Sequence, residues 1–372
     1  YLDAGQVSSR ETLLKLCLES TWPAIRFYCN ELSIHADPNR NFEELVAVCE
    51  RISTLIHPEK FPERVDVSVV ICTRNRPDFL RNCLNALRHQ ISLPLEIVVV
   101  DNAPSTNETA SVCAQFENVK YVREDRMGLD IARNTGARAT KGSVVAYTDD
   151  DTLPDPHWAY RISETFEKTN VVAMTGLVLA GSLRTEAEVI FEKFWPFNRG
   201  FVHKLFDHVF FNEKLPEGAP VWEIGAGANM AFRREIFEDV GYFDERLDVG
   251  AAGCSGDSEL WYRILANGFT IRYNPLAAVK HYHRDSLDGL RRQLYSYMKG
   301  FTVAILIQYQ RFGHRGNLLH LFKVVPKYYM SLLRKGFPRY NFQYQTLFSE
   351  MRGILSGMIY YAKHRNRNAR IY

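Results

Sequence analysis

Four short apolar runs rich in β-branched residues most strongly limit the folds that this chain can adopt. They lie at residues 67–72, 95–100, 119–122 and 143–148. Runs of this kind are typical of strands that are buried in a sheet. Helical patterns at residues 77–90 and 129–139 lie between them. Strands that alternate with helices at this spacing predict an α/β fold, with a parallel sheet and helices on its faces.

Polar side chains follow three of these runs, at the points where the predicted strands end. They are Thr73, Arg74 and Asn75 after the first run, Asp101 and Asn102 after the second, and Asp149, Asp150 and Asp151 after the fourth. In such sheets, ligands bind at the carboxyl ends of strands near a switch in strand order. The sequence therefore predicts a binding site at this edge.

The acidic triplet indicates a metal ion. Three adjacent carboxylates repel one another, so a fold that gathers them usually supplies a cation. Mg²⁺ and Mn²⁺ prefer carboxylate oxygens and often bridge to substrate phosphates. An acidic turn that caps the next helix is the alternative. The chain has no phosphate-binding loop of the GxxxxGK[ST] type, so we expect the cation and Arg133 to neutralise any bound diphosphate.

Chain length and cysteine usage narrow the class of protein. The chain has 372 residues, 46% of them hydrophobic, and no apolar run reaches the ~20 residues that span a bilayer. The seven cysteines are scattered and form no C-x-x-C pair. We therefore expect reduced thiols and a cytoplasmic location. We also expect no signal peptide, because the first residues lack its basic-then-apolar pattern.

Charge is unevenly distributed along the chain. Residues 291–372 hold 15 Lys and Arg but a single acidic residue, Glu350. Aromatic residues such as Tyr328 and Phe337 lie among these basic residues. This combination suits an anionic membrane face, where each Lys or Arg contributes about 1 kcal/mol. We therefore expect peripheral association at the inner face of the cell membrane. A helical tail that packs on the body is the alternative, and we do not expect nucleic acid as a partner.

Three parts are predicted: an N-terminal helical segment at residues 1–62, an α/β domain at 63–290, and a basic, aromatic-rich helical region at 291–372. In the first part, Asn41 and Glu44 form a capping-box pattern before an apolar series of helical spacing, Leu45, Val48, Ile52 and Leu55. Pro58 and Pro62 end the pattern, which places the boundary near residues 57–64.

Taken in order, the motifs of the chain resemble the signature of family 2 glycosyltransferases, which have the GT-A fold. The motifs are TRNRP at 73–77, VVVDN at 98–102, ARNTG at 132–136, DDD at 149–151, GANMAFR at 227–233, GYFD at 241–244, GDSEL at 256–260 and HYHR at 281–284. Each motif alone is weakly specific, but eight in this order are specific. The resemblance covers roughly residues 66–300 and implies a Rossmann-like mixed sheet flanked by helices.

The resemblance implies roles on the donor side of the site. Thr73 and Arg74, with Asn75, would line the nucleoside pocket, and Asp101 would accept a hydrogen bond from the base. Asp149, Asp150 and Asp151 contain the D-x-D motif, in which Asp151 would meet the metal and Asp149 the ribose or the metal. Either His281 or His283 would be the late metal-facing histidine, and the spacing does not choose between them.

The resemblance also implies a general base and an acceptor side. Asp257 matches the base, although Gly256 stands where the family usually has Glu, and Glu259 is the fallback. Gly227 and Asn229 lie on the acceptor-side motif. Trp222 is a further acceptor candidate because aromatic faces stack on sugar rings, with core packing as the alternative.

The implied function is inverting, metal-dependent transfer of a sugar from a nucleotide-diphosphate sugar to an acceptor hydroxyl. A glycan or a lipid-linked acceptor in cell-surface glycan synthesis fits the basic C-terminal region. Two alternatives stay open. A nucleotidyltransferase that makes the sugar donor would release pyrophosphate, and it would need a Gly- and Arg-rich loop where residues 73–77 lie. A non-catalytic, nucleotide-sugar-binding subunit of a polysaccharide assembly would show no transfer.

Overall fold

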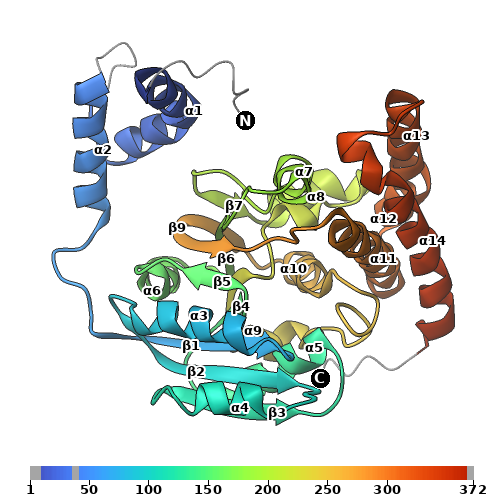
Figure 1. The fold of residues 1–372 in the computed structure, drawn as a ribbon, viewed down its shortest axis with the longest axis horizontal. Helices are drawn as coiled ribbons and strands as arrows, with labels where there is room; N and C mark the ends of the chain where they lie inside the picture. Colours follow the sequence, from blue (N-terminus) through green and yellow to red (C-terminus); the bar gives the residue numbers. More distant parts are fainter. Residues whose placement is uncertain (1–9, 36–41, 367–372) are drawn as a thin grey trace. The chain divides into compact units, whose positions relative to one another are not determined.

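The apolar runs form the central strands of a mixed sheet in a computed structural model, which describes residues 10–35 and 42–366 (Figure 1). The strands are β1 (Arg64–Thr73), β2 (Leu93–Asn102), β3 (Val119–Glu124), β4 (Val144–Asp149), β5 (Thr152–Pro154), β6 (Ala173–Ala180), β7 (Lys204–Phe206), β8 (Asn229–Arg233) and β9 (Ile271–His281). Their spatial order is β3-β2-β1-β4-β8-β6-β9-β5, with β7 paired to β9. The predicted sheet flanked by helices is confirmed.

Strand direction changes in the middle of the sheet. Three neighbouring pairs are parallel: β1 with β2, β1 with β4, and β2 with β3. β8 then lies antiparallel between β4 and β6. The carboxyl ends of β1, β2 and β4 therefore meet at one edge, beside the point where the strand order switches. This is where a sheet of this kind binds ligands.

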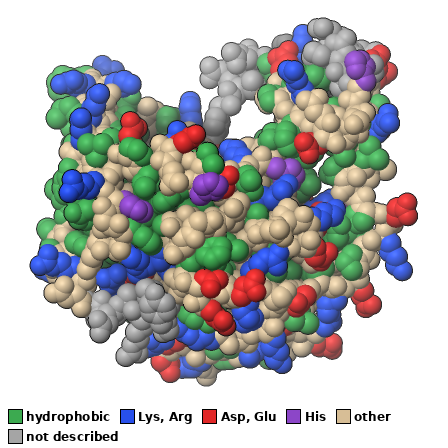
Figure 2. Space-filling view, turned by 180° about the vertical axis from the view of Figure 1, so that it is seen from behind, with side chains coloured by type: hydrophobic (Ala, Val, Ile, Leu, Met, Phe, Trp, Pro, Cys, Tyr) green, Lys and Arg blue, Asp and Glu red, His purple; other side chains and the backbone are tan. Residues whose placement is uncertain are grey.

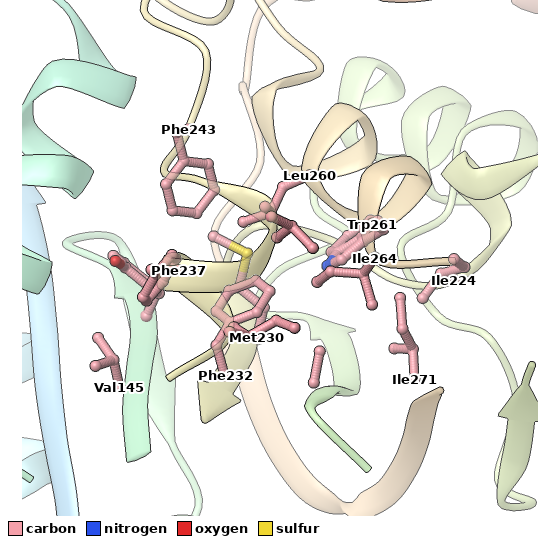
Figure 3. Close-up of a cluster of buried hydrophobic side chains, with 14 of the residues drawn as sticks. Val145, Ile224, Met230, Phe232, Phe237, Phe243, Leu260, Trp261, Ile264 and Ile271 are labelled. Atoms are coloured by element: carbon pink, nitrogen blue, oxygen red, sulfur yellow. The ribbon is translucent and has the colours of Figure 1, made fainter. Parts of the chain in front are cut away.

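Alternate residues of the central strands point into two different layers of core. On β1, Val67, Val69 and Ile71 pack with the helices on one face, whereas Val70 packs with those on the other. The first layer contains α3 (Pro77–Arg88) and α6 (Trp158–Lys168), and the second contains α5 (Leu129–Ala139), α9 (Ile236–Val240) and α10 (Gly256–Ala266). Figure 3 shows part of the second layer, where Phe232, Phe243 and Trp261 lie together. A strand buried on both faces needs no polar alternation, which explains the continuous apolar runs.

The remaining helices after β1 either connect strands of the sheet or follow β9 as a C-terminal layer. They are α4 (Glu108–Cys113), α7 (Glu186–Phe194), α8 (His208–Lys214), α11 (Leu287–Phe312), α12 (Arg315–Leu319), α13 (Val325–Gly336) and α14 (Leu347–His364), with the shorter helical turns η1 (Leu215–Glu217), η2 (Val221–Glu223), η3 (His320–Val324) and η4 (Phe342–Thr346). Gly353 and Gly357 let α14 lie directly on α11, because a Cβ at either position would come within 2.6 Å of an α11 carbonyl oxygen. None of the helices within the described ranges is both long and apolar enough to cross a bilayer.

The chain divides into two compact units, residues 1–62 with 200–202, and residues 63–199 with 203–372. The first unit contains α1 (Arg10–Glu31) and α2 (Phe42–Ile56). Val48 and Ile52 of α2 are buried as the helical spacing predicts, but Leu55 is 49% exposed. Asn41, the proposed cap of α2, lies outside the described residues.

The predicted boundary between residues 290 and 291 falls inside α11. Residues 291–372 also belong to the same compact unit as the sheet. The change in charge at residue 291 therefore marks a change of surface within this unit. The physical reason is that α11 buries Leu290 and Leu294 with Phe191 of α7, so the helix is part of the body from its first turns.

Candidate active site

The acidic triplet lies at the end of β4, in the tight turn that leads to β5. The Thr152 hydroxyl donates to the Asp149 carbonyl oxygen at 2.8 Å and closes this turn. Asp150 and Asp151 are buried, and Asp149 is partly exposed. The three carboxylates thus lie at the edge of the sheet where the ends of β1 and β2 also lie, as the sequence predicts.

Arg76 bridges two of the three carboxylates. Its Nη1 donates to Asp150 Oδ1 at 2.5 Å and its Nη2 donates to Asp151 Oδ2 at 2.8 Å. The Thr73 hydroxyl donates to Asp150 Oδ2 at 2.7 Å. Both carboxylate oxygens of Asp150 therefore accept hydrogen bonds from Thr73 and Arg76. Sequence reasoning gave no role to Arg76. Its place inside the TRNRP motif, three residues after Thr73, is the signal that could have identified it.

His281 lies beside the triplet, although it comes much later in the sequence. The β5–β9 register pairs Thr152 with His281, and His281 Nε2 lies 3.3 Å from Asp151 Oδ1. One ligand atom each from Asp149, Asp151 and His281 lie within 4.8 Å of one another. Within the described part of the chain, no hydrogen bond is made to Asp151 Oδ1. Burial lowers the pKa of His281 to about 4, so the imidazole is neutral at pH 7.

These three groups fit a divalent cation. Two carboxylates and a neutral imidazole are a donor set that Mn²⁺ accepts, and the buried carboxylate oxygen without a hydrogen-bond partner needs a positive neighbour. Burial, together with the nearby charge of Asp151, raises the pKa of Asp149 to about 7. Burial also raises the pKa of Asp150 to about 6, although Arg76 opposes the rise. A cation at this point would reverse both shifts, because it stabilises ionised carboxylates.

The structure separates the two candidate histidines. His283 Nδ1 lies 3.3 Å from His281 Nδ1, and His283 Nε2 lies 3.3 Å from Glu192 Oε2. His283 is thus turned toward α7 and away from the triplet, and it fixes the ring of His281. Such an outer partner orients a metal-binding histidine. Glu192 was not found from the sequence, because nothing in a local pattern links it to a histidine 91 residues later.

Asp257 lies in the first turn of α10, facing the loop before β8. Its Oδ1 accepts from the Ser258 backbone N–H at 2.6 Å. A Cβ built on Gly227 would lie 2.9 Å from Asp257 Oδ2 and 2.8 Å from Arg133 Nη2. Gly227 therefore allows the carboxylate and the guanidinium to approach the same point. Asp257 is partly exposed, and burial raises its pKa while the charge of Arg133 opposes the rise.

Arg133 is the centre of a second acidic cluster. Its Nη1 donates to Asp130 Oδ1 at 2.9 Å and to Asp248 Oδ2 at 2.7 Å, and all three side chains are buried. The predicted role of Arg133, neutralising a diphosphate, is not supported by these contacts, because its charge is already shared by buried carboxylates. Asp130 and Asp248 were not found from the sequence.

The departure of Gly256 from the family pattern has a structural reason. A Cβ at this position would lie 2.0 Å from Asp130 Oδ2. Any side chain at 256 would overlap the Asp130 carboxylate, which is 1% exposed. A carboxylate from α5 therefore occupies the space that a side chain preceding Asp257 would need.

Comparison with known proteins agrees with this geometry. Residues 68–241 match the family model described as glycosyl transferase family 2. Residues 68–241 are therefore a glycosyltransferase family 2 domain. The match spans β1 to the end of α9, so it contains the triplet and Gly227, whereas Asp257 and His281 lie beyond it. Of the three functions considered from the sequence, this finding favours a glycosyltransferase and gives no support to a nucleotidyltransferase.

The chain is similar to curated proteins of archaea and bacteria. Glycosyltransferase AglE of Haloferax volcanii is 28% identical over 214 residues, 56% of this chain and 64% of AglE. O-antigen biosynthesis protein RfbC of Myxococcus xanthus is 25% identical over 218 residues, 55% of this chain and 16% of RfbC. Glucosyl-dolichyl phosphate glucuronosyltransferase of H. volcanii is 28% identical over 259 residues, 64% of this chain and 77% of that protein. The first two matches cover less than two thirds of the relative.

Among solved structures, the mannosyltransferase PcManGT from Pyrobaculum calidifontis, in complex with GDP-Man and Mn²⁺, has a TM-score of 0.50 and 17% identity, covering 93% of this chain and 98% of that one. At this identity the likeness shows the fold alone. The family 2 domain has the GT-A fold, a curled mixed sheet flanked by helices, with helical segments at both ends of the described chain.

On the predicted nucleoside side, the ends of β1 and β2 are tied together. Arg74 Nε donates to the Ala103 carbonyl oxygen at 3.3 Å, and Asn75 Oδ1 accepts from the Ser105 N–H at 3.0 Å. Asp101 is fully buried and accepts from the Tyr121 hydroxyl at 3.0 Å. Arg74 and Asn75 therefore lie at the surface beside a buried Asp101. A cavity of about 540 Å³ opens on Asp150 and Asp151 and is lined by residues of α3 and by Tyr282, but not by Asp257.

Three acceptor-side candidates make contacts within the protein. The amide of Asn229 accepts from Trp158 and donates to two backbone carbonyls, at 1% exposure, so it joins strands within the core. The Glu259 carboxylate is fully buried between Arg263 and Arg311. The ring of Trp222 packs 5.1 Å from the rings of Phe301 and His320. These contacts are structural, so Gly227 alone stays beside Asp257.

Proposed function

We propose that this family 2 domain transfers a sugar from a nucleotide-diphosphate sugar to an acceptor hydroxyl, with inversion at the anomeric carbon. One observation carries the proposal. The ligand atoms of Asp149, Asp151 and His281 lie within 4.8 Å of one another, although His281 lies on a different strand late in the chain. Their neighbours Thr73, Arg76 and Asp150 come from the ends of β1 and β4, where a diphosphate is expected in this fold.

In this proposal Asp149, Asp151 and His281 hold Mn²⁺ or Mg²⁺. The bound cation would offset the negative charge that develops on the diphosphate leaving group. His283 and Glu192 keep the His281 ring in place, and Arg76 bridges the Asp150 and Asp151 carboxylates by donating to one oxygen of each. Thr73, Arg74 and Asn75 border the nucleoside. Asp101 would meet the base only after the loop beyond β2 opens, because it is fully buried.

Asp257 is proposed as the general base. Its carboxylate is partly exposed beside Gly227, which places no side chain of its own against it. It would take the proton of the acceptor hydroxyl as the oxygen bonds to the anomeric carbon and the bond to the diphosphate breaks. A single displacement of this kind inverts the anomeric centre and needs no covalent intermediate. Burial raises the pKa of Asp257, and the charge of Arg133 opposes this rise and so favours the ionised carboxylate.

A thermal-shift screen of nucleotide sugars, with and without Mn²⁺, tests the donor half of the proposal. A ligand that binds only the folded chain stabilises it by ~2.7 kcal/mol at one hundred times its dissociation constant. We expect stabilisation by one or a few nucleotide-diphosphate sugars, only when the cation is present. Equal shifts with EDTA and with Mn²⁺ would contradict the proposed site. The anomeric configuration of the product, read by NMR, tests inversion.

The acceptor is proposed to be a glycan or a lipid-linked sugar in cell-surface glycan synthesis. One relative is named a glucosyl-dolichyl phosphate glucuronosyltransferase, which is consistent with a lipid-linked acceptor. Residues 291–372, with 15 basic residues and one acidic residue, are proposed to associate peripherally with an anionic membrane at its cytoplasmic face.

A further inference from the structure

Exposed apolar side chains gather on the C-terminal helices. On η3 and α13, Phe322, Tyr328 and Met330 are 57%, 55% and 50% exposed, and on α14, Phe348, Leu355 and Ile359 are 59%, 62% and 58% exposed. We call these six residues the C-terminal face. Scattered exposed apolar residues are ordinary, but six on two helices that contact each other are a concentration that points to a partner surface.

None of the six belongs to the buried cluster that anchors these helices, although the rings of Phe348 and Tyr328 pack on Tyr340 and Tyr329. The buried side of η3 and α13 consists of Leu321, Val325 and Tyr329, which pack with Met298 and Ile305 of α11. The two helices are joined by the Tyr329 hydroxyl, which donates to Glu350 Oε2 at 2.9 Å. The C-terminal face is therefore an additional apolar surface on helices that are already anchored.

The α14 part of the face is a single helical stripe with basic members. Phe348, Arg352, Leu355, Ile359 and Lys363 follow one another at spacings of three or four residues, and all five are exposed. Residues at this spacing lie on one side of a helix. Long basic side chains in such a stripe can lay their stems on apolar surface and keep the charge in the headgroup region.

The charge around the face is of one sign. Lys323, Lys327, Arg334 and Lys335 are exposed beside the apolar residues of η3 and α13. The only acidic residue from 291 to the end of the sequence is Glu350, and its carboxylate is 3% exposed and accepts from Tyr329 and Thr346. In Figure 2 the side formed by α13 and α14, at the left, accordingly shows mainly hydrophobic and basic side chains.

This charge pattern decides between two occupants. A second copy of the chain docked face to face would place basic residues against basic residues, with no exposed acid from these helices to pair them. An anionic bilayer presents negative headgroups above an apolar interior, which matches a basic and apolar face in both respects.

We propose that the C-terminal face is the surface on which the protein docks to an anionic phospholipid bilayer, with the six apolar side chains at the headgroup–acyl boundary. The inference deepens the proposed membrane association of residues 291–372 by naming the side chains that make it. The docked helices also support the η2 segment, since His320 of η3 packs 5.1 Å from Trp222. The family 2 domain and its bilayer-facing surface thus form one body, as a lipid-linked acceptor requires.

Vesicle flotation with the full chain tests the inference. The probes are vesicles of phosphatidylcholine alone and of phosphatidylcholine with phosphatidylglycerol. The unvaried chain is expected to float only with the anionic vesicles. Phe348→Ser/Leu355→Ser/Ile359→Ser should lower the partition coefficient at least a hundredfold, because each buried side chain contributes about a tenfold factor. Lys323→Gln/Lys327→Gln/Lys335→Gln should lower it about a hundredfold, at about fivefold for each charge.

Matched controls lie elsewhere on the same unit. Leu205 and Val209 are 56% and 49% exposed, and Lys204 and Lys214 are exposed. Leu205→Ser/Val209→Ser and Lys204→Gln/Lys214→Gln should float like the unvaried chain. The inference is overturned if the face variants float as well as these controls, or if sedimentation shows a dimer that the face variants dissociate without any change in flotation. Thermal unfolding confirms that each variant is folded. A missing donor-induced shift with intact flotation would count against sugar transfer alone.

Discussion

Two clusters of carboxylates lie in the same domain and differ in how their charge is balanced. Asp149, Asp150 and Asp151 have Arg76 on one side and neutral His281 on the other, and a cavity opens on Asp150 and Asp151. Asp130 and Asp248 enclose Arg133 completely, with Asp257 close to it across Gly227. Within the described residues, both clusters hold a buried carboxylate oxygen without a hydrogen-bond partner, Asp151 Oδ1 in the first and Asp130 Oδ2 in the second. The first cluster borders a cavity and a neutral imidazole, whereas the carboxylates of the second enclose an arginine. We therefore propose ion binding at the first cluster and proton transfer at the second.

The largest expected effect falls on the second cluster. Asp257→Asn keeps the shape and removes the base, so we expect turnover to fall about 10³-fold, within the range of general-base catalysis. Donor affinity, measured by the Mn²⁺-dependent thermal shift, should stay within about twofold, since Asp257 lies outside the metal-binding cluster. Near-normal turnover in this variant would show that Asp257 is not the general base. The second cluster would then have no proposed role in proton transfer.

Arg133→Met and Arg76→Met together compare how much each arginine contributes to the free energy of unfolding. Arg133→Met leaves Asp130 and Asp248 buried without a counter-ion, which should lower the free energy of unfolding by about 3–5 kcal/mol. Arg76→Met should cost less, because Arg76 is 29% exposed and its carboxylates border a cavity. Urea unfolding of both variants measures the difference. Equal losses of unfolding free energy would mean that the two clusters are equally shielded from solvent.

Asp151→Ala probes the first cluster directly. Removal of one of three ligands should abolish the Mn²⁺-dependent part of the donor-induced thermal shift, a loss of at least a hundredfold in donor affinity. Asp155→Ala is the matched control, because Asp155 is a nearby acidic residue whose side chain is 46% exposed and lies outside the cluster. If both variants bind donor alike with Mn²⁺ and with EDTA, the triplet is an acidic turn and not an ion site.

Gly256 and Asp130 give a smaller, pairwise effect within the second cluster. Gly256→Ala should destabilise the chain by about 1–3 kcal/mol, because the new methyl group meets the Asp130 carboxylate. In an Asp130→Gly background the same change should cost little, which gives a coupling energy of about 1–2 kcal/mol. A double-mutant cycle from urea unfolding measures it. Additive effects would show that the two residues do not compete for one space.

Acidification should weaken ion binding at the first cluster. The carboxylates must be ionised to bind a cation, and the pKa of Asp149 is raised to about 7. Protons therefore compete with the ion, and Mn²⁺ affinity should fall about fivefold from pH 7 to pH 6. Isothermal titration of Mn²⁺ at several pH values gives this slope, together with the protons released. A flat profile would place the bound ion away from Asp149.

Much of the sheet could be predicted from the sequence because its signals are local. The helix expected at residues 129–139 is α5 (Leu129–Ala139), the run at 67–72 lies inside β1 (Arg64–Thr73), and the run at 143–148 is offset by one residue from β4 (Val144–Asp149). Apolar periodicity and strand-terminating polar residues are properties of a few consecutive positions. They also place Thr73, Asp101 and Asp149 at one edge without any knowledge of contacts, since parallel strands share the direction of their ends.

Several site candidates contact side chains or carbonyls that lie far away in the sequence. Asn229 and Glu259 belong to motifs of the acceptor side, yet the first binds carbonyls of β6 and β9 and the second binds Arg263 and Arg311. Arg133 was assigned to phosphate, but Asp248, 115 residues later, takes its charge. A motif gives residue types at fixed spacings and does not say which of two nearby charges each residue will meet.

The sequence by itself therefore determined the alternation of strands and helices and the edge of the sheet where the carboxylates end. Tertiary structure alone decided that His281 faces Asp151 while His283 faces Glu192, that Asp130 fills the space above Gly256, and that apolar residues of α13 and α14 stay exposed. The reason is physical. Backbone periodicity is set by neighbouring residues, whereas the partner of a buried charge is set by whichever distant segment packs against it.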